Sequence, residues 1–245
     1  MQLQFLGSGD AFGAGGRFNT CFMVSASDTR FLIDCGATSL VAMASAGVDP
    51  NSIDKVLLTH LHGDHFAGVP FMLVHAHSAS GRRSPLTIAG PRTTERRVME
   101  TMECLYPGSA DRNWKFDIIF EEYDVGREWR SDSISVLPFQ ARHSAGEGPA
   151  LALRITVDGK IITYSGDGGW SDDLLAAADG ADLFIAECYF YDKQVDYHMS
   201  LTTLELHMAE INAKRVILTH MDDDVLERVQ SLDLETAEDG KIIEI

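Results

Sequence analysis

The sequence predicts an α/β (α+β) fold in which strands and helices follow one another along a single chain of 245 residues. Short runs of Val, Ile and Leu recur and are typical of buried strands. Helix-length segments separate several of these runs, and one pair of runs meets at Asp158-Gly159, a dipeptide that favours a hairpin. Because no linker or low-complexity stretch divides the chain, we expect one domain over residues 1–245.

The expected elements follow from alternation, apolar runs and the residues that end them. Alternating residues at 1–6 suit an edge strand, and a glycine-rich stretch follows at 7–16. That stretch has no Walker-type lysine, so we interpret it as a tight loop between strands rather than a phosphate-binding loop. The further expected strands cover residues 20–26, 30–34, 56–58, 86–89, 117–122, 133–139, 150–157, 160–164, 182–186, 215–219 and 241–245. The expected helices cover residues 37–46, 66–74, 91–106, 172–178 and 201–211.

The composition excludes several classes of protein. The four cysteines form no C-x-x-C pair, which argues against a disulfide framework and fits a reducing compartment. The first residues do not resemble a signal peptide, and no run reaches the roughly 18 apolar residues of a membrane span. We therefore expect a soluble, cytoplasmic protein with no membrane partner, and a homodimer is one open form of assembly.

The charge balance is strongly acidic. Lys and Arg number 20 against 37 Asp and Glu, which gives a net charge of −17, and such a surface repels polyanions at long range. Residues 81–97 depart from this pattern. We interpret this arginine patch as a solvated surface, with an anion-attracting rim near the site as the alternative. Its members are Arg82, Arg83, Arg92, Arg96 and Arg97.

The stretch Thr59-His60-Leu61-His62-Gly63-Asp64-His65 directly follows the apolar run 56–58. Imidazole and carboxylate groups are ligands suited to Zn²⁺ and its neighbours. His60 and His62 are two positions apart, so both rings can point the same way in an extended loop. Asp64 and His65 follow at once and can face a second metal. The sequence therefore predicts a metal site here.

Other apolar runs also end in a side chain that can bind a metal or carry a proton. The stretches 55–60 and 215–220 even read alike, each ending in Thr-His. If these strands run in the same direction, their ends converge at one edge of the fold, where loop residues can do chemistry on a rigid scaffold. The residues that follow or end such runs are His143, Asp167, Glu187 and His220.

The number of candidate ligands points to two metals. A catalytic zinc takes three protein ligands and a water, so seven ligands suit two ions that share one carboxylate. Asp167 is the candidate bridge, because the glycines around it let the backbone approach closely. We expect two divalent ions, with zinc first and manganese or iron as alternatives. The seven ligands are His60, His62, Asp64, His65, His143, Asp167 and His220.

The cluster at 59–65, followed in order by His143, Asp167 and His220, resembles the metallo-β-lactamase fold superfamily over essentially the whole chain. The resemblance implies a four-layer αββα metallo-β-lactamase sandwich, with two mixed sheets between outer helices and the metals at one edge. It also implies that Asp167 bridges the metals. By that resemblance the first metal is held by His60, His62 and His143, and the second by Asp64, His65 and His220.

Within the superfamily the chain is most similar to the ribonuclease Z-like phosphodiesterases. Leu6-Gly7-Ser8-Gly9 follows the first strand, Glu187 ends a later strand, and His198 lies in Tyr197-His198-Met199-Ser200. In that group the glutamate and the histidine form a pair at the scissile phosphate. One departure is Ala186, since a histidine usually precedes the glutamate.

The second departure lies between the third motif and the bridging aspartate. True ribonuclease Z inserts its tRNA-gripping arm there, whereas His143 and Asp167 are only 24 positions apart in this chain. A plain hairpin fills that interval. The resemblance therefore implies a ribonuclease Z-like phosphodiesterase that lacks the tRNA-binding arm.

From these residues we expect a metal-dependent hydrolase, a phosphodiesterase for small phosphodiesters or nucleic-acid ends. Two ions lower the pKa of a shared water towards roughly 7, and the metal-bound hydroxide attacks phosphorus. Asp64 orients that water or takes its proton. His198 protonates the departing alkoxide, and Glu187 holds its ring. The expected partner is a small-molecule phosphodiester, with an RNA end as the second candidate.

Rival functions use the same fold. A lactone or thioester hydrolase of the lactonase or glyoxalase II type would direct the hydroxide to a carbonyl. Only 25 residues follow His220, too few for the helical substrate domain of glyoxalase II, so small lactonases are the open alternative. β-Lactamases generally lack a histidine at the position of His65, and the di-iron branch has glutamate in place of His62. A non-catalytic metal-binding module would have lost ligands, and none is missing.

Overall fold

The computed structural model describes residues 1–109 and 112–245, and its strands form two seven-stranded sheets. The first sheet contains β1 (Gln2–Gly7), β2 (Cys21–Ser25), β3 (Arg30–Ile33), β4 (Lys55–Leu57), β5 (Leu86–Gly90), β6 (Ile118–Glu122) and β14 (Ile242–Glu244). Their order is β14-β1-β2-β3-β4-β5-β6. Neighbours from β14 to β3 pair antiparallel, and neighbours from β3 to β6 pair in parallel.

The second sheet contains β7 (Trp129–Ser131), β8 (Ile134–Gln140), β9 (Leu151–Val157), β10 (Lys160–Tyr164), β11 (Leu183–Glu187), β12 (Val216–Thr219) and β13 (Glu235–Thr236). Their order is β13-β12-β11-β10-β9-β8-β7. Strands β10 to β13 pair in parallel, whereas β9 pairs antiparallel with both β10 and β8. Strand β8 therefore runs in the same direction as β10, β11 and β12.

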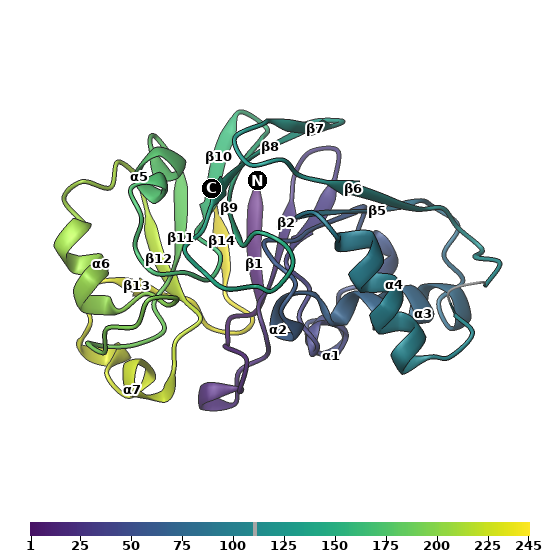
Figure 1. The fold of residues 1–245 in the computed structure, drawn as a ribbon, viewed down its shortest axis with the longest axis horizontal. Helices are drawn as coiled ribbons and strands as arrows, with labels where there is room; N and C mark the ends of the chain where they lie inside the picture. The colour runs from purple at the N-terminus through teal and green to yellow at the C-terminus, as the bar shows by residue number, and fades with distance from the viewer. Residues whose placement is uncertain (110–111) are drawn as a thin grey trace.

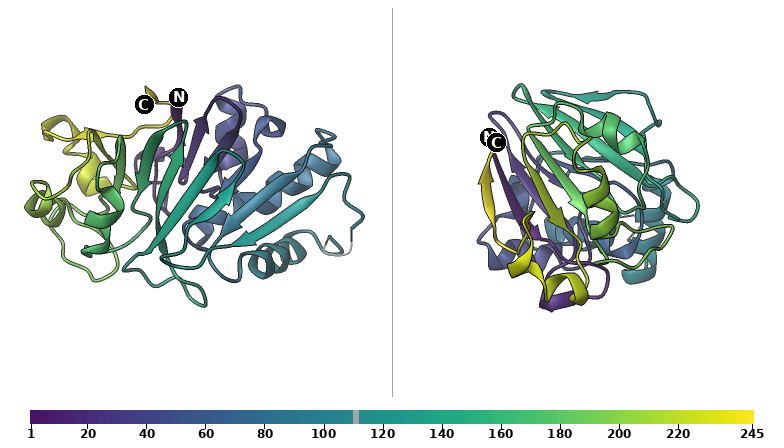
Figure 2. Two further views of the ribbon diagram at one scale, coloured as in Figure 1. Left: turned by 90° about the horizontal axis from the view of Figure 1, so that it is seen from above. Right: turned by 90° about the vertical axis from the view of Figure 1, so that its left-hand side faces the viewer.

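The helices lie outside the two sheets, as the ribbons in Figures 1 and 2 show. They are α1 (Ser39–Ser45), α2 (Gly63–Phe66), α3 (Gly68–Ser78), α4 (Thr94–Leu105), α5 (Asp173–Ala178), α6 (Leu201–His207) and α7 (Asp223–Leu226). The described residues also form three short 3₁₀ helices, at Ala14–Gly16, Pro50–Ser52 and Val229–Ser231. No helix in the described ranges is both long and apolar enough to cross a bilayer.

Three apolar cores hold the four layers together. Side chains alternate along each strand, so Phe22 and Val24 of β2 pack between the sheets while Met23 packs against the outer helices. The central core joins strands of both sheets, and the two outer cores join each sheet to its own helices. This arrangement is the αββα sandwich expected from the sequence.

The strands deliver their polar ends to one edge. His60 follows β4 of the first sheet, and His143, Asp167 and His220 follow β8, β10 and β12 of the second. The two similar stretches 55–60 and 215–220 therefore belong to different sheets and still end at the same edge, as the sequence predicted. The Asp158-Gly159 hairpin is also confirmed: φ is +52° and +70° at these residues, as the tight β9–β10 turn requires.

Several element predictions were wrong in detail. Strand β1 lies inside the sheet, because β14 pairs with its outer side. The predicted helix 66–74 corresponds to α3, which begins at Gly68 and ends at Ser78, and the short helix α2 that precedes it was not predicted. The predicted helix 201–211 ends at His207, and β7, β13 and α7 were not predicted at all. These missed elements are two to four residues long, too short for apolar periodicity to reveal.

Candidate metal centre and active site

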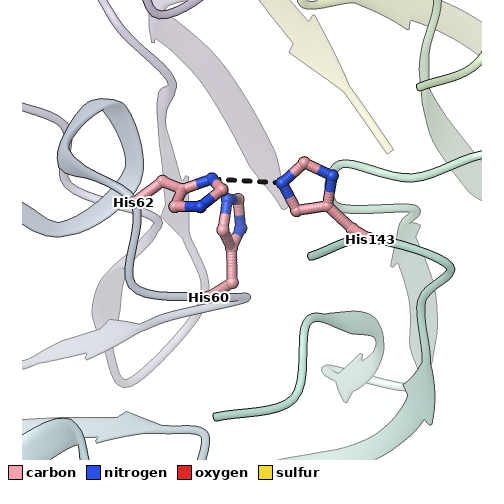
Figure 3. Close-up of side chains that lie close together, drawn as sticks. All are labelled: His60, His62 and His143. Atoms are coloured by element: carbon pink, nitrogen blue, oxygen red, sulfur yellow. Dashed lines mark hydrogen bonds between the residues drawn. The ribbon is translucent and has the colours of Figure 1, made fainter. Parts of the chain in front are cut away.

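The first donor group consists of His60, His62 and His143, whose ligand atoms lie within 4.8 Å of one another. Figure 3 shows the three rings facing a common point, two from the loop after β4 and one from the loop after β8. Nδ1 of His62 lies 3.1 Å from Nε2 of His143. Nδ1 of His143 lies 2.8 Å from the backbone carbonyl of Tyr197, to which it donates, so Nε2 is left with a free lone pair.

The second donor group adjoins the first and contains Asp64, His65, Asp167 and His220. Nε2 of His65 lies 3.2 Å from Oδ2 of Asp64 and 3.2 Å from Oδ1 of Asp167. Nε2 of His220 lies 3.2 Å from the same Asp64 oxygen and 3.5 Å from Oδ2 of Asp167. Two carboxylates and two imidazoles thus surround one small space.

Asp167 stands between the two groups. Besides facing His65 and His220, its Oδ2 lies 4.0 Å from Nε2 of His60 in the first group. The side chain of Asp167 is almost fully buried. It is the carboxylate placed to serve both groups at once.

Asp34 supports this centre and was not predicted from the sequence. Its Oδ2 accepts a hydrogen bond from Nδ1 of His65 at 2.7 Å, and both side chains are fully buried. Thr59 donates to the same carboxylate from its backbone N–H and its hydroxyl. Asp34 directly follows β3, so the rule that found the other strand-end residues would also have found it.

The loop that carries Asp34 is pressed against helix α2. The backbone N–H of Cys35 donates to the carbonyl of His65 at 2.7 Å. A Cβ at Gly36 would lie 2.1 Å from the carbonyl oxygen of Asp64, so this close approach requires glycine. Asp34 and His220 both adopt left-handed backbone conformations, with φ of +58° and +56°. Such strain in non-glycine residues is typical of functional sites.

The electrostatics of the centre suit a cation. Burial on its own raises the pKa of Asp167, but His220 and His65 outweigh it and hold that pKa well below its usual range. Burial on its own also raises the pKa of Asp64, but His65 and His220 outweigh it and lower that pKa. The carboxylates in turn raise the pKa of His65 and His220 against the effect of burial. The imidazoles of His65 and His220 therefore favour their positively charged form between the ionised carboxylates. A metal ion can supply the positive charge at this place instead.

The first group has the opposite character. Burial lowers the pKa of His60 well below its ordinary value, and the neighbouring His65 adds to this effect. Burial also lowers the pKa of His143. These imidazoles are thus held neutral, which is the form that binds metal.

Several buried polar atoms of the centre lack a hydrogen-bond partner among the described residues. They are Nε2 of His60, Nε2 of His65, Oδ1 of Asp167 and Nδ1 of His220. Buried polar atoms of native proteins are nearly always satisfied. A cluster of unsatisfied nitrogen and carboxylate atoms therefore fits a site that binds metal ions.

Glu187 and His198 form a third feature beside the donor groups. Oε1 of Glu187 lies 2.5 Å from Nδ1 of His198, and its Oε2 accepts from the backbone N–H groups of Gly168 and Met199 at 2.8 and 3.0 Å. Glu187 is fully buried, whereas the side chain of His198 is 27 % exposed. The pair thus has a fixed inner end and an imidazole that solvent and substrate can reach.

Both members of the pair have raised pKa values. Burial and the nearby Asp167 carboxylate raise the pKa of Glu187. Burial on its own lowers the pKa of His198, but the hydrogen bond to Glu187 outweighs it and raises that pKa. The two shifts keep a proton on the pair, which is the property that a proton donor needs.

The structure brings together all nine residues predicted for the site. Four arginines of the patch have partners elsewhere in the protein. Arg82 is 2 % exposed and donates to the carbonyls of Ser84 and Pro85. The next three are paired with acids, Arg92 with Asp124, Arg96 with Glu100 and Glu147, and Arg97 with Glu100. The exposed Arg92, Arg96 and Arg97 agree with the interpretation of the patch as a solvated surface, whereas the buried Arg82 contradicts it. Arg96 and Arg97 also line a cavity of about 310 Å³ together with Leu61, the residue between His60 and His62, which agrees with the alternative of a rim near the site.

Comparison with known proteins defines the class. A ribonuclease Z of Mycobacterium bovis (strain BCG / Pasteur 1173P2) is 27% identical over 240 residues, which cover 90% of this chain and 85% of that protein. The crystal structure of human tRNase Z, short form, superposes with a TM-score of 0.80 and 23% identity, and the match covers 100% of this chain and 99% of that one. The metallo-β-lactamase fold protein YhfI of Bacillus subtilis covers 99% of both chains at a TM-score of 0.76 and 22% identity. The protein is thus a ribonuclease Z-like hydrolase of the metallo-β-lactamase fold, which confirms the resemblance and the fold class predicted from the sequence.

A family model narrows this class. The model described as Anti-Pycsar protein Apyc1 matches residues 1–240, so the chain belongs to that family. The Anti-Pycsar protein Apyc1 of Paenibacillus sp. (strain J14) is 29% identical over 234 residues, which cover 92% of this chain and 91% of that protein. The sequence predicted the broader ribonuclease Z-like class and not this family.

Proposed function

We propose that this protein is a phosphodiesterase with two metal ions that hydrolyses small phosphodiesters. The observation that carries the proposal is the placing of the Glu187–His198 pair beside two adjoining groups of metal-binding side chains. A proton donor next to a double cation site suits the cleavage of a bond that leaves an alkoxide. The ribonuclease Z relatives and the PhnP-family diphosphatase of the same fold support phosphodiester chemistry over lactone or thioester hydrolysis.

The donor set supports zinc as the metal. Five imidazoles and two carboxylates match the ligands that zinc prefers, and manganese and iron accept the same ones. When bound, the two ions act as Lewis acids that activate water and neutralise charge on the phosphoryl oxygens. We assign the first ion to His60, His62 and His143, the second to Asp64, His65 and His220, and Asp167 to both.

Asp64 and Asp34 act on the side of the attacking water in this proposal. Asp64 directs one oxygen at His65 and His220, and we assign it to orienting the attacking water or taking its proton. Asp34 fixes the tautomer of His65, because an Nδ1–H that donates to a carboxylate leaves Nε2 free for metal. The chain's own contribution here is to hold its donors in one geometry before substrate arrives.

His198 acts on the leaving-group side in this proposal. Glu187 holds its Nδ1, so Nε2 is the atom that gives a proton to the departing oxygen. The hydrogen bond to Glu187 outweighs burial and raises the pKa of His198, which favours the protonated form that a proton donor needs. The ring of His198 lies 5.0 Å, centroid to centroid, from that of His143, so the donor stands directly beside the metal centre.

Charge and topology support a small substrate. The net charge of −17 opposes a long polyanion, whose binding depends on several contacts from Lys or Arg to phosphates. Four arginines of the patch are already engaged within the protein. Between His143 and Asp167 lies only the β9–β10 hairpin, which continues the sheet and extends no arm.

A panel of substrates tests this proposal. Metal-analysed protein is assayed on a phosphodiester, a phosphomonoester, a thioester and a lactone at equal concentrations. We expect hydrolysis of the diester at least tenfold faster than of the others. Hydrolysis of the lactone or thioester but not of the diester would overturn the proposal of a phosphodiesterase. The proposed metal centre would survive that outcome.

We also propose the cytoplasm as the compartment, supported by the four free thiols. We propose residues 1–245 as one domain, supported by the central core that both sheets share.

A further inference from the structure

Tyr189 lies against the proposed proton donor, although it belongs to neither group of metal-binding side chains. It is the second residue after Glu187, at which β11 ends. The centroid of its ring lies 4.7 Å from that of the His198 ring, and the two ring planes are inclined by 33°. Aromatic rings at this separation are in direct contact. The tyrosine ring therefore covers part of one face of the imidazole.

The hydrogen bond to Glu187 holds only one atom of the His198 ring. Nδ1 of His198 lies 2.5 Å from Oε1 of Glu187. The torsion about the Cβ–Cγ bond of a histidine has a broad energy minimum, so a ring held at one nitrogen can still rock about that bond. Rocking changes the direction of the Nε2–H bond, and a proton donor works only when this bond points at the departing oxygen. A second contact that stops the rocking would therefore help the reaction.

Tyr189 can stop the rocking because its own position is fixed. Its backbone carbonyl accepts a hydrogen bond from the N–H of Asp222 at 3.0 Å. The ring of Phe190 meets the tyrosine ring nearly edge-on, with centroids 4.6 Å apart and planes 79° from parallel. The tyrosine is thus tied to the loop that follows β12 and is packed against its chain neighbour.

Asp10 anchors the hydroxyl end of the tyrosine. Asp10 is 1 % exposed, and its Oδ1 accepts hydrogen bonds from the backbone N–H groups of Phe12 and Ala14 at 3.2 and 2.9 Å. Burial and the neighbouring carboxylate of Asp10 raise the pKa of Tyr189 to about 12. The hydroxyl therefore stays protonated beside a carboxylate that is itself held in place, and the ring is fixed at both of its ends.

From this geometry we infer that Tyr189 is a positioning residue for His198: its ring limits the rocking of the imidazole, and Asp10 holds the tyrosine in place. The inference rests on the proposed function, since the direction of Nε2–H matters only if His198 protonates the leaving group. In the reaction, water forms a new P–O bond and the bond from phosphorus to the alcohol breaks. Nε2 of His198 gives its proton to the alcohol oxygen, and Tyr189 exchanges no proton.

The rival role for Tyr189 is support of the metal centre. Its ring also lies 5.6 Å, centroid to centroid, from that of His220, which belongs to the second donor group. Support of the metal would matter equally for every substrate. Positioning of His198 matters only for a leaving group that needs a proton, so the two roles differ in their dependence on the leaving group.

Tyr189→Leu in metal-loaded protein separates these roles on two diesters, one with an alkyl alcohol and one with nitrophenol as the leaving group. We expect kcat on the alkyl diester to fall roughly tenfold with KM unchanged, which is part of the 10²–10⁴ that a proton donor supplies. On the nitrophenyl diester kcat should stay within about twofold, because nitrophenolate departs without a proton. Tyr189→Phe keeps the ring and should lose less than Tyr189→Leu.

The same substitution in a His198→Ala protein shows whether Tyr189 acts through the histidine. Tyr189→Leu should then cost nothing further on the alkyl diester, because residues that act as a unit are not additive. Tyr191→Leu is the matched control, since the ring of Tyr191 lies 4.8 Å from the guanidinium of Arg228 and supports another part of the surface. It should leave the ratio of the two kcat values unchanged.

Equal losses on both diesters, or a further loss in the His198→Ala protein, would overturn the inference. A crystal structure of Tyr189→Leu gives a readout that needs no activity. We expect the ring of His198 in more than one orientation, and a single unchanged orientation would also overturn the inference. If metal-loaded wild type hydrolyses neither diester, the proposed function fails, and the crystal structure still decides whether Tyr189 fixes the ring.

Discussion

Nδ1 of His65 lies 2.7 Å from Oδ2 of Asp34, and both side chains are fully buried. The contact determines which ring nitrogen of His65 carries its proton. Asp34→Asn places an amide N–H opposite Nδ1 and favours the tautomer with the proton on Nε2, the atom that faces Asp64 and Asp167. We expect metal affinity to fall roughly 10–100-fold, as for other partners of metal-binding histidines.

Competition with a chelator measures that affinity. Asp54→Asn is the control, since Asp54 accepts a backbone N–H from Arg30 and lies outside the donor groups. Equal affinity in Asp34→Asn and wild type would show that the tautomer of His65 does not matter for binding.

Asp167 faces both donor groups, whereas His143 belongs to one. Asp167→Ala should therefore reduce the bound metal from about two ions per chain to less than one, and His143→Ala should remove about one. Elemental analysis of protein purified without chelator gives the count. If the Asp167→Ala protein keeps two ions per chain, Asp167 is not a ligand that both metals share.

His198 is proposed as a proton donor and not as a ligand. His198→Ala should keep its metal and lose roughly 10²–10⁴ in kcat on a diester with an alkyl alcohol as leaving group. The loss should be much smaller for a nitrophenyl diester, because nitrophenolate departs without a proton. Steady-state kinetics on both substrates decide the point, and equal losses would remove His198 from this role.

Glu235 contributes a stability term that depends on pH. The hydrogen bond from Arg215 outweighs burial and lowers the pKa of Glu235 to about 2. A carboxyl whose pKa is lowered by folding stabilises the protein above its ordinary value of 4.5, and this stabilisation is lost as pH falls towards 2. Because the ion pair is partly exposed, Glu235→Gln should cost only about 0.2–1 kcal/mol at pH 7.

Urea unfolding of metal-free protein at several pH values tests this term. The difference in unfolding free energy between wild type and Glu235→Gln should shrink below about pH 4.5. A difference that stays constant down to pH 3 would mean that the carboxylate of Glu235 is not stabilised by Arg215.

Much of the fold and of the site could be predicted because it depends on patterns among neighbouring residues in the sequence. The run before His60 and the matching run before His220 each end at a residue of the centre, and burial on both faces makes such strands apolar throughout. The tight turn at Asp158-Gly159 requires positive φ at both residues, a conformation that few other dipeptides adopt. These features depend on neighbouring residues, so the sequence contains them directly.

The rest depended on contacts between distant segments. Asp34 reaches His65 across 31 positions, and Arg142 reaches Asp196 across 54. Nothing near Gln2–Gly7 in the sequence shows that β14, at the other end of the chain, covers its outer side. Pairings of this kind follow from packing of the whole chain, so the pattern of neighbouring residues does not reveal them.

The most direct test of the central claim compares a small diester with precursor tRNA on the same metal-loaded protein at physiological salt. The acidic surface, the paired arginines and the β9–β10 hairpin predict efficient hydrolysis of the small diester and little accurate cleavage at the tRNA 3′ end. Binding of RNA should also be weak. Efficient tRNA cleavage by this chain alone, with RNA affinity that falls steeply as salt rises, would contradict the account.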